Sequence, residues 1–274
     1  SHWESAPGCT ISVTYSLTDS SGTGNIAVDP GFLGVDNYKL AASSLLINAG
    51  DIANTDADDS RSDIGAYPYN NDFNGPIWYV TTAGDDTSGT GSNDSPFASV
   101  QAAINFATTA GDSIAVGSGT FTENVHFRGR QVKVHGTGYY STVIDGGSAG
   151  SVVHFDGGED QSTVLADMTL ENGSADYGGG IYAYNASPIL KNLYISDNYA
   201  ATGGGGINLT TNSNPSLTNV IIANNSTGDH GGGIVFHDSS DASLDRVTVA
   251  DNSANVSGNG LWLWGGSSPS VTNS

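Results

Sequence analysis

The Asp-rich stretch at residues 51–63 is the part of this sequence best suited to binding a hard cation. Its closely spaced carboxylate and hydroxyl groups are of the type that wraps Ca²⁺ in protein loops. The side chains that we expect to bind Ca²⁺ as a structural ion are Asp56, Asp58, Ser60 and Asp63. We expect Arg61 to neutralise part of their charge. The alternative is an acidic turn whose carboxylates are solvated.

A second group of candidate ligand-binding residues is largely aromatic and follows a repeated Gly triplet, first seen at residues 178–180. If the apolar residue after each triplet is buried in a strand, the residues one and three positions later face outward. These positions form two columns, Tyr182, Asn208, Val235, Trp262 and Tyr184, Thr210, His237, Trp264. Aromatic rings on a flat sheet can stack on sugar rings or pack against a partner. We therefore expect carbohydrate or a partner to contact Tyr182, Tyr184, His237, Trp262 and Trp264, the alternative being a surface ladder that binds nothing.

Acid–base catalysis has one candidate group on adjacent predicted loops, which contains Asp229, His230, His237, Asp238 and Asp241. A glycosidase needs carboxylates on both sides of a cleft, one of them with a raised pKa. A polysaccharide lyase needs a Lys or Arg base beside the sugar, and the 7 basic residues form no cluster along the repeats. Polar loop residues of this kind are common in repeat proteins. We therefore expect a protein without catalytic activity, and an enzyme stays the open alternative.

Composition excludes several function classes. The 274 residues include 7 Lys and Arg against 28 Asp and Glu, a formal net charge of −21, whereas nucleic-acid binding needs clustered basic side chains. The single cysteine, Cys9, excludes a disulfide framework and a thiolate zinc site, and we expect it to be an inert thiol. No apolar run is long enough to span a bilayer. We expect neither a nucleic-acid partner nor a transmembrane segment.

The balance of residue types also indicates a location. Few Lys, many Asp, Asn, Gly, Ser and Thr, and a single Cys are typical of an extracellular protein at a bacterial surface. Residues 1–4 have neither the basic start nor the apolar core of a signal peptide, so we expect a mature product or an excised piece.

The second half of the chain repeats itself about every 27 residues. The apolar residues after the Gly triplets, Ile181, Ile207, Ile234 and Leu261, are separated by 26, 27 and 27 residues. Two further columns keep this period, Asn172, Asn198, Asn225, Asn252 and Asn192, Asn219, Arg246, Asn273. We expect the first Asn column to adopt left-handed turns and to bond in a side-chain ladder, and Arg246 to point outward. A period of this length indicates a solenoid.

Each repeat contains three short segments with alternating apolar residues, such as 181–184 and 193–195. Segments this short with a period of two are strands. Stacking every coil on its predecessor places equivalent strands at the ~4.8 Å spacing of a sheet, which gives a parallel β-helix. Ahead of the coils, Phe97, Val100, Ile104 and Ala107 share one helical face, as expected of a short helix that covers the open end of the core.

Residues 77–147 resemble the beginning of bacterial pectate-lyase-like proteins. The resemblance rests on the strand at 78–81, the helical segment at 96–107, and the segments at 111–116, 119–125 and 142–147. The Gly-Gly-Gly-Ile repeats that follow are similar to those of polymorphic outer-membrane proteins of bacterial surfaces. Both resemblances imply an all-β fold, the right-handed parallel β-helix (solenoid) of the pectin lyase type, with a short N-terminal capping helix near 97–107.

Residues 1–70 resemble the closing segment of choice-of-anchor Q proteins, where it ends a β-helix of secreted or surface-attached bacterial proteins. The similar segments are 24–32, 38–40, 43–51 and 63–67, and the departure is Pro68 where the family usually has Glu. The resemblance implies three parts. Residues 1–69 would be the C-terminal coil and cap of a parallel β-helix, 70–76 a linker, and 77–274 the N-terminal cap and coils of a parallel β-helix.

A closing segment placed before an opening one is explained if this chain is one period of an array. If another copy followed Ser274, its Asn25 would continue the column that contains Asn273. We therefore expect copies to join head to tail, as covalent tandem repeats or as filament subunits. The expected function is that of a structural unit of an extracellular bacterial surface fibre or adhesin-like array. The alternative is a carbohydrate-binding or polysaccharide-cleaving β-helix protein.

Overall fold

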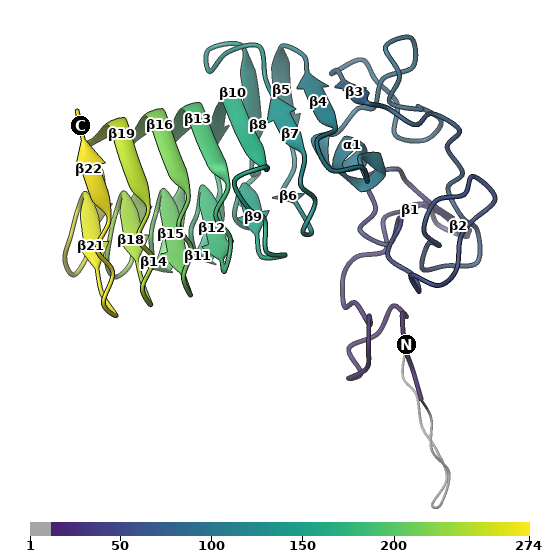
Figure 1. The fold of residues 1–274 in the computed structure, drawn as a ribbon, viewed down its shortest axis with the longest axis horizontal. Coiled ribbons are helices and arrows are strands. Elements are labelled where there is room, and N and C mark those ends of the chain that lie inside the picture. Colours follow the sequence, from purple (N-terminus) through teal and green to yellow (C-terminus); the bar gives the residue numbers. More distant parts are fainter. Residues whose placement is uncertain (1–11) are drawn as a thin grey trace, which may run out of the picture.

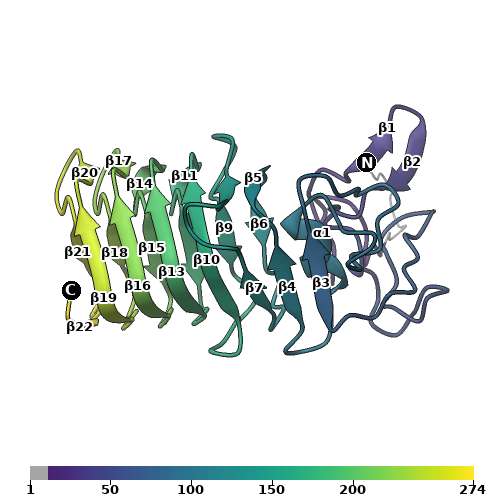
Figure 2. The ribbon, with the colours of Figure 1, turned by 90° about the horizontal axis from the view of Figure 1, so that it is seen from above.

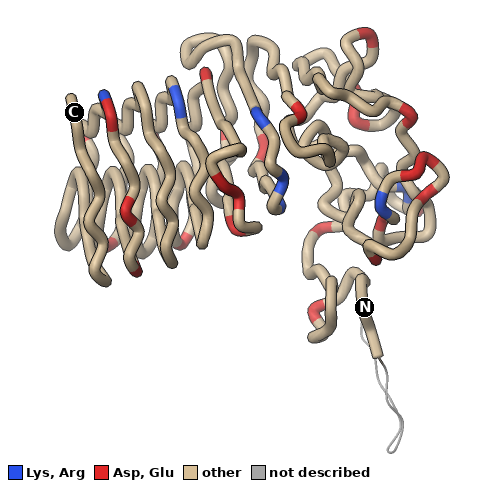
Figure 3. The backbone as a smooth tube through the Cα atoms, viewed as in Figure 1, with Lys and Arg blue, Asp and Glu red and all other residues tan. Residues whose placement is uncertain are grey.

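The computed structural model describes residues 12–274, so Cys9 lies outside the described residues. A parallel β-helix runs from β3 (Ile77–Val80) to β22 (Ser270–Thr272), and its coils stack along one axis (Figure 1). The C-terminus lies at the end of the solenoid that is far from α1 (Val100–Phe106). Acidic residues occur along the whole length of the chain and basic residues are few (Figure 3).

Three parallel sheets form the sides of the solenoid (Figure 2). The first sheet contains β3, β4 (Ser113–Val116), β7 (Lys133–His135), β10 (Val164–Glu171), β13 (Ile189–Ser196), β16 (Ser216–Ala223), β19 (Ser243–Ala250) and β22, with β5 (Gly119–Thr122) and β8 (Thr142–Asp145) at its side. The second contains β6 (Val125–His126), β9 (Val153–Phe155), β12 (Ile181–Tyr184), β15 (Ile207–Thr210), β18 (Ile234–Phe236) and β21 (Leu261–Leu263). The third contains β11 (Ser174–Tyr177), β14 (Tyr199–Gly203), β17 (Ser226–Thr227) and β20 (Ser253–Ala254). The predicted parallel β-helix with three short strands per repeat is confirmed.

The core is built from columns of equivalent apolar side chains. Ile181 pairs with Ile207 and Ile207 with Ile234 in the second sheet, and all three are fully buried. The first sheet adds a parallel column of Leu190, Leu217 and Leu244. Because every coil places the same type of residue on the same side, the 27-residue period fixes the register of all three sheets.

Glycine is required at the triplets because successive coils approach one another closely through their main chains. Gly178 and Gly204 adopt φ values of 59° and 69°, in the left-handed region that glycine tolerates best. A Cβ atom on Gly180 would lie 2.6 Å from the carbonyl oxygen of Gly206 and from the Cγ2 of Ile195. Such a distance is far inside van der Waals contact, so a side chain there would push two coils apart.

The two Asn columns have different roles. The first column forms the expected buried ladder through Asn198, Asn225 and Asn252. These three residues do not have a left-handed conformation. The fourth member of the column, Asn172, does have one (φ 57°). The residues before the three buried amides, Asp197, Asn224 and Asp251, make the left-handed turn instead. This corrects the expectation: the amides that turn inward need ordinary backbone to reach each other. The second column is left-handed throughout, at Asn192, Asn219, Arg246 and Asn273, and Arg246 points outward as expected, bonded to Asn219 and Asp245.

The short capping helix is confirmed as α1. Ser99 caps it, with its Oγ accepting a hydrogen bond from the amide of Ala102, as Ser does at helix N-termini. The carboxylate of Glu123 accepts hydrogen bonds from the amides of Val100 and Gln101. All residues of α1 are buried, because the chain before the solenoid covers the side of the helix that faces away from the coils.

The segment before the solenoid consists mostly of turns around a hairpin of β1 (Phe32–Gly34) and β2 (Asn37–Leu40). Its contacts with the helix include apolar packing, such as Tyr69 against Phe106 with ring centroids 5.3 Å apart, and buried hydrogen bonds. The side-chain amide of Asn105 donates to the carbonyl oxygens of Ala42 and Ser44, both at 2.8 Å, and that of Asn48 donates to the carbonyl oxygen of Asn105 at 3.0 Å. The segment predicted to close a β-helix thus lies, in this chain, against the cap that opens one.

Residues 70–76, expected to be a linker, are held to both neighbouring parts. The amide of Asn71 donates to the carboxylate of Asp58, and its side chain donates to the carbonyl oxygen of Thr90. Phe73 packs edge-on against Trp78, with ring centroids 5.0 Å apart. These contacts fix the path of the chain between the first segment and the solenoid.

Candidate functional site

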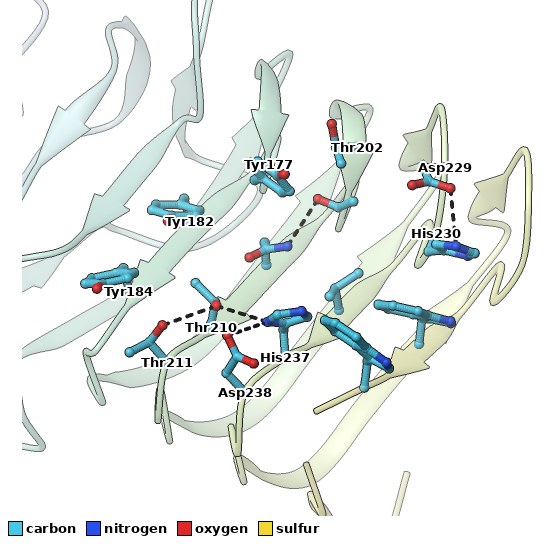
Figure 4. Close-up of a pocket in the computed structure, with 15 residues that line it drawn as sticks. Tyr177, Tyr182, Tyr184, Thr202, Thr210, Thr211, Asp229, His230, His237 and Asp238 are labelled. Carbon is cyan, nitrogen blue, oxygen red and sulfur yellow. Dashed lines mark hydrogen bonds and ion pairs between the residues drawn. The ribbon is translucent and has the colours of Figure 1, made fainter. Parts of the chain in front are cut away.

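A groove of about 520 Å³ lies on the outward face of the second sheet, over β12, β15, β18 and β21 (Figure 4). It brings together all five residues that the sequence predicts to contact a ligand, Tyr182, Tyr184, His237, Trp262 and Trp264. Tyr177, Thr202, Thr211 and Asp238 add to its walls from turns and the neighbouring sheet. The groove crosses four coils, so it is an elongated site.

Strand register creates the two columns that line the groove. In the first column Tyr182 pairs with Asn208, Asn208 with Val235 and Val235 with Trp262. Asn208 and Val235 are buried instead of exposed, which differs from the expectation. The side-chain amide of Asn208 donates to the carbonyl oxygen of Gly203 at 3.4 Å, and Val235 packs against Gly231. The turns beside these two side chains cover them, which explains their burial. Both still line the groove and form its floor.

Larger rings stand at the two ends of this floor. One end carries Tyr177, Tyr182 and Tyr184 (Figure 4). The other end carries Trp262 and Trp264, whose ring centroids are 6.3 Å apart and whose ring planes are nearly parallel, at an angle of 23°. Tyr182 and Trp262 are three coils apart, or about 14 Å at the spacing of strands in a sheet. The groove can therefore accommodate an extended ligand that contacts rings at both ends.

Two histidines at the tryptophan end pack against the indole rings and pair with carboxylates, and of these two His230 is stacked and His237 is tilted. His230 lies parallel to Trp262 with centroids 4.4 Å apart, and His237 lies 4.4 Å from Trp264. His237 Nδ1 is 2.8 Å from the carboxylate of Asp238, and His230 Nε2 is 3.3 Å from that of Asp229. The pairs orient the rings and place hydrogen-bonding atoms beside the groove.

The candidate group for acid–base catalysis, which belongs to the alternative interpretation as an enzyme, is only partly assembled. Asp229, His230, His237 and Asp238 all line the groove, but Asp241 does not. The carboxylate of Asp241 accepts a hydrogen bond from the amide of Ser268 in the next coil. Asp241 is therefore engaged in holding two turns together. The two groove carboxylates are each paired with a histidine of the same turn.

The carboxylates of the predicted calcium site hold the main chain of their own turn. Asp58 accepts hydrogen bonds from the amides of Ser60 and Asn71, and Asp56 accepts one from the amide of Asp63. Arg61 does not pair with these acids as expected, because its guanidinium donates to the carbonyl oxygens of Ala49 and Gly50. Calcium binding here stays a prediction.

Asp63 is the most perturbed acid of that turn. Its two carboxylate oxygens accept hydrogen bonds from the amides of Asn48 and Tyr69. Burial first, and then the neighbouring charges of Asp56 and Asp58, raise the pKa of Asp63 to about 6, although the two backbone hydrogen bonds lower it. The turn thus concentrates negative charge that a cation would relieve.

One cluster was missed by the sequence analysis. His126 of β6, His154 of β9 and Asp156 have potential ligand atoms that all lie within 4.8 Å of one another. The two imidazoles are stacked, with centroids 4.3 Å apart and planes at 10°. Burial lowers the pKa of His154 to about 4 and also lowers that of His126. A sequence signal for this cluster was present, because each histidine directly follows a valine that pairs in the column of Ile181. It was missed because no Gly triplet marks those earlier coils.

Comparison with known proteins gives one match. A family model described as a right-handed β-helix region matches residues 115–274. No curated protein and no solved structure matches the chain. Within residues 12–274, no helix has the length and apolar character needed to cross a membrane.

Proposed function

Because this chain belongs to the right-handed β-helix family, we propose that it uses the outward face of one sheet to bind an extended, neutral glycan. The observation that carries the proposal is the gathering of five predicted ligand-binding side chains in one groove. Tyr and Trp rings present flat apolar faces on which sugar rings can stack. Asn208, Thr210 and Asp229 line the same groove and offer hydrogen-bonding atoms for hydroxyl groups.

Charge favours a neutral glycan over an acidic one. The chain has a formal net charge of −21, and the groove is lined by the carboxylates of Asp229 and Asp238 without any Lys or Arg among its described lining residues. A polyuronate would be repelled by this field. The missing basic side chain also argues against a lyase that needs such a base. We propose binding in place of cleavage.

The test is calorimetric titration of neutral β-glucan, xylan and mannan oligosaccharides into the full chain. We expect one of these series to bind, and Trp264→Ala to weaken binding about tenfold, since one lost ring contact is worth about 1.4 kcal/mol. Tyr140→Ala is the matched control, because Tyr140 is 87% exposed and does not line the groove. The proposal would be refuted if none of the neutral series binds, or if the Trp264→Ala variant binds with the same affinity as the wild type. Release of reducing ends would show that the groove cleaves its glycan.

We propose self-association as a further role, which the resemblance of residues 1–70 to segments that close β-helices supports. The last coil exposes apolar side chains that are buried one coil earlier: Leu261, Leu263 and Val271 are 36%, 45% and 51% exposed, whereas Ile234, Phe236 and Leu244 are buried. Among the described residues, no strand pairs with the outer edges of β20, β21 and β22. We propose that copies of this chain stack head to tail on this end, as units of a bacterial surface fibre or adhesin-like array.

The occupant of this end would be the N-terminal segment of a second copy. In that segment Leu17 and Ile26 form an isolated parallel bridge. The resemblance of residues 1–70 to segments that close β-helices supports the same arrangement. An extracellular location is supported by composition, with few Lys and one Cys.

Light scattering and negative-stain imaging of the purified chain test the stacking. We expect a concentration-dependent growth in mass and filaments along the solenoid axis, and we expect Leu263→Asp to leave monomers. Tyr140→Asp is the control and should still assemble. A chain that stays monomeric at all concentrations would refute self-stacking without affecting the glycan proposal.

A further inference from the structure

We propose that His126, His154 and Asp156 form a binding site for a divalent transition-metal ion, separate from the groove and independent of its proposed function. The potential ligand atoms of these three side chains lie within 4.8 Å of one another. Within the described residues, this is the one group of three or more His, Cys, Asp or Glu side chains that meets this distance. The site is therefore a geometric feature, distinct from the general acidity of the surface.

Strand register assembles this cluster. His126 and His154 are direct neighbours in the pairing of β6 with β9, so their side chains leave the sheet side by side, about one strand spacing (~4.8 Å) apart. Asp156 directly follows the last residue of β9, and its carboxylate lies within 4.8 Å of the ligand atoms of both histidines. All three side chains thus point outward from two adjacent coils.

The ligand types select a class of metal. Two imidazoles and one carboxylate suit Zn²⁺, Cu²⁺ or Ni²⁺, whereas Ca²⁺ and Mg²⁺ prefer oxygen ligands alone. Zn²⁺ bonds of about 2.0–2.1 Å in a tetrahedral site hold the ligand atoms about 3.3 Å apart. The stacked rings, with planes at 10°, must therefore turn toward each other, and the broad torsion that orients a His ring permits this.

Exposure leaves room for a fourth ligand. The imidazoles of His126 and His154 are half-buried and the carboxylate of Asp156 is exposed, so an ion would be held between the coils and open to solvent. Three protein ligands with one open position are the arrangement in which a metal keeps a water or takes up an external ligand. The column continues from His154 to Tyr182, whose ring centroid lies 5.7 Å away, so an external ligand would lie one coil from the groove.

Calorimetric titration of Zn²⁺ into the full chain, without a histidine tag and in excess Ca²⁺, tests the site. The excess Ca²⁺ occupies acidic oxygen sites elsewhere on the chain. We expect one saturable site per chain. Replacing His126 or His154 by Ala should weaken binding at least tenfold, because even residues that only support a metal ligand are worth about 10–100-fold.

His230→Ala is the matched control, because His230 also lies beside a carboxylate on the outward face but outside the cluster. It should leave Zn²⁺ affinity and stoichiometry unchanged. Asp156→Asn replaces an exposed side chain and so tests the site if a His variant fails to fold; it should weaken binding as well. In addition, Co²⁺ should give visible absorption bands that disappear in His154→Ala. The proposal would be overturned if no saturable Zn²⁺ site is found in the presence of Ca²⁺. It would also be overturned if the Asp156→Asn and His154→Ala variants bind Zn²⁺ with the affinity of the wild type.

Discussion

The side-chain oxygen of Asn225 accepts two hydrogen bonds from Asn198 one coil away, from its backbone amide at 3.1 Å and from its side-chain amide at 3.0 Å. Asn225 repeats the pattern toward Asn252, with distances of 2.9 and 3.0 Å. It also donates to the carbonyl oxygen of Ile195. One buried amide therefore links three coils and satisfies main-chain groups that a turn would otherwise leave unpaired.

Replacing Asn225 by Ala should strongly destabilise the solenoid. The change leaves buried donors on Asn198 and a buried carbonyl without partners, and each such group costs about 1–3 kcal/mol. We expect a loss of more than about 2 kcal/mol in the free energy of unfolding, measured with urea. Asn255→Ala, at an exposed position of the next repeat, should cost about 0.5 kcal/mol or less. Equal losses in the two variants would contradict a structural role for the ladder.

Replacing Ile207 by Ala tests the columns of the core. Ile207 is fully buried between Ile181 and Ile234, so the truncation should leave a cavity and cost about 2–5 kcal/mol. Leu261→Ala removes the equivalent side chain in the last coil, where it is 36% exposed, and should cost less. The comparison requires dilute monomer and thermal or urea unfolding. A larger loss for Leu261 than for Ile207 would mean that the end coil is covered in solution.

The sequence predicts the solenoid well because its repeat encodes geometry directly. Three residue columns with a common period of about 27 residues set the coil length, and the register follows from it. The capping helix follows from the spacing of Phe97, Val100 and Ile104, all buried in the structure. These features are local or periodic, which is what a sequence pattern can carry.

What the sequence could not predict depends on how turns fold over the sheet. Asn208 and Val235 occupy outward positions but are buried, because the turns that contain Gly203 and Gly231 cover them. The left-handed residue of each inner turn precedes the buried Asn, at Asp197 and Asn224. The pairing of His126 with His154 was missed because the first coils lack the repeated triplet. Burial by a neighbouring turn depends on tertiary contacts, which leave no periodic mark in the sequence.

Calcium should stabilise the acidic turn if Asp56, Asp58 and Asp63 share an ion. The mutual repulsion of these carboxylates, part of the cause of the raised pKa of Asp63, would be relieved by a bound cation. We expect Ca²⁺ to raise the Tm of chelator-treated His154→Ala protein saturably, and Asp56→Asn to reduce that rise. Asp29→Asn, outside the turn, is the control. If neither chelator nor Ca²⁺ changes the Tm, calcium has no structural role here.

Glu123 should make the stability of the cap depend on pH. Its carboxylate accepts hydrogen bonds from Val100 and Gln101 at the start of α1, while burial raises its pKa from 4.5 to about 7. The folded chain therefore holds this proton more tightly than the unfolded chain does. Its contribution to the free energy of unfolding is fully present below about pH 4.5, is lost progressively as the pH rises, and is gone above about pH 7.

Glu123→Gln isolates this contribution, because glutamine has nearly the same shape but no titrating proton. The variant can accept one of the two hydrogen bonds and should lose stability relative to the wild type at acidic pH. The difference between wild-type and variant unfolding free energies should fall between pH 4.5 and about 7, since only the wild type must then bury a charge. Urea unfolding across this range measures the difference. A difference that stays constant or rises with pH would show that the helix N-terminus stabilises the ionised carboxylate instead.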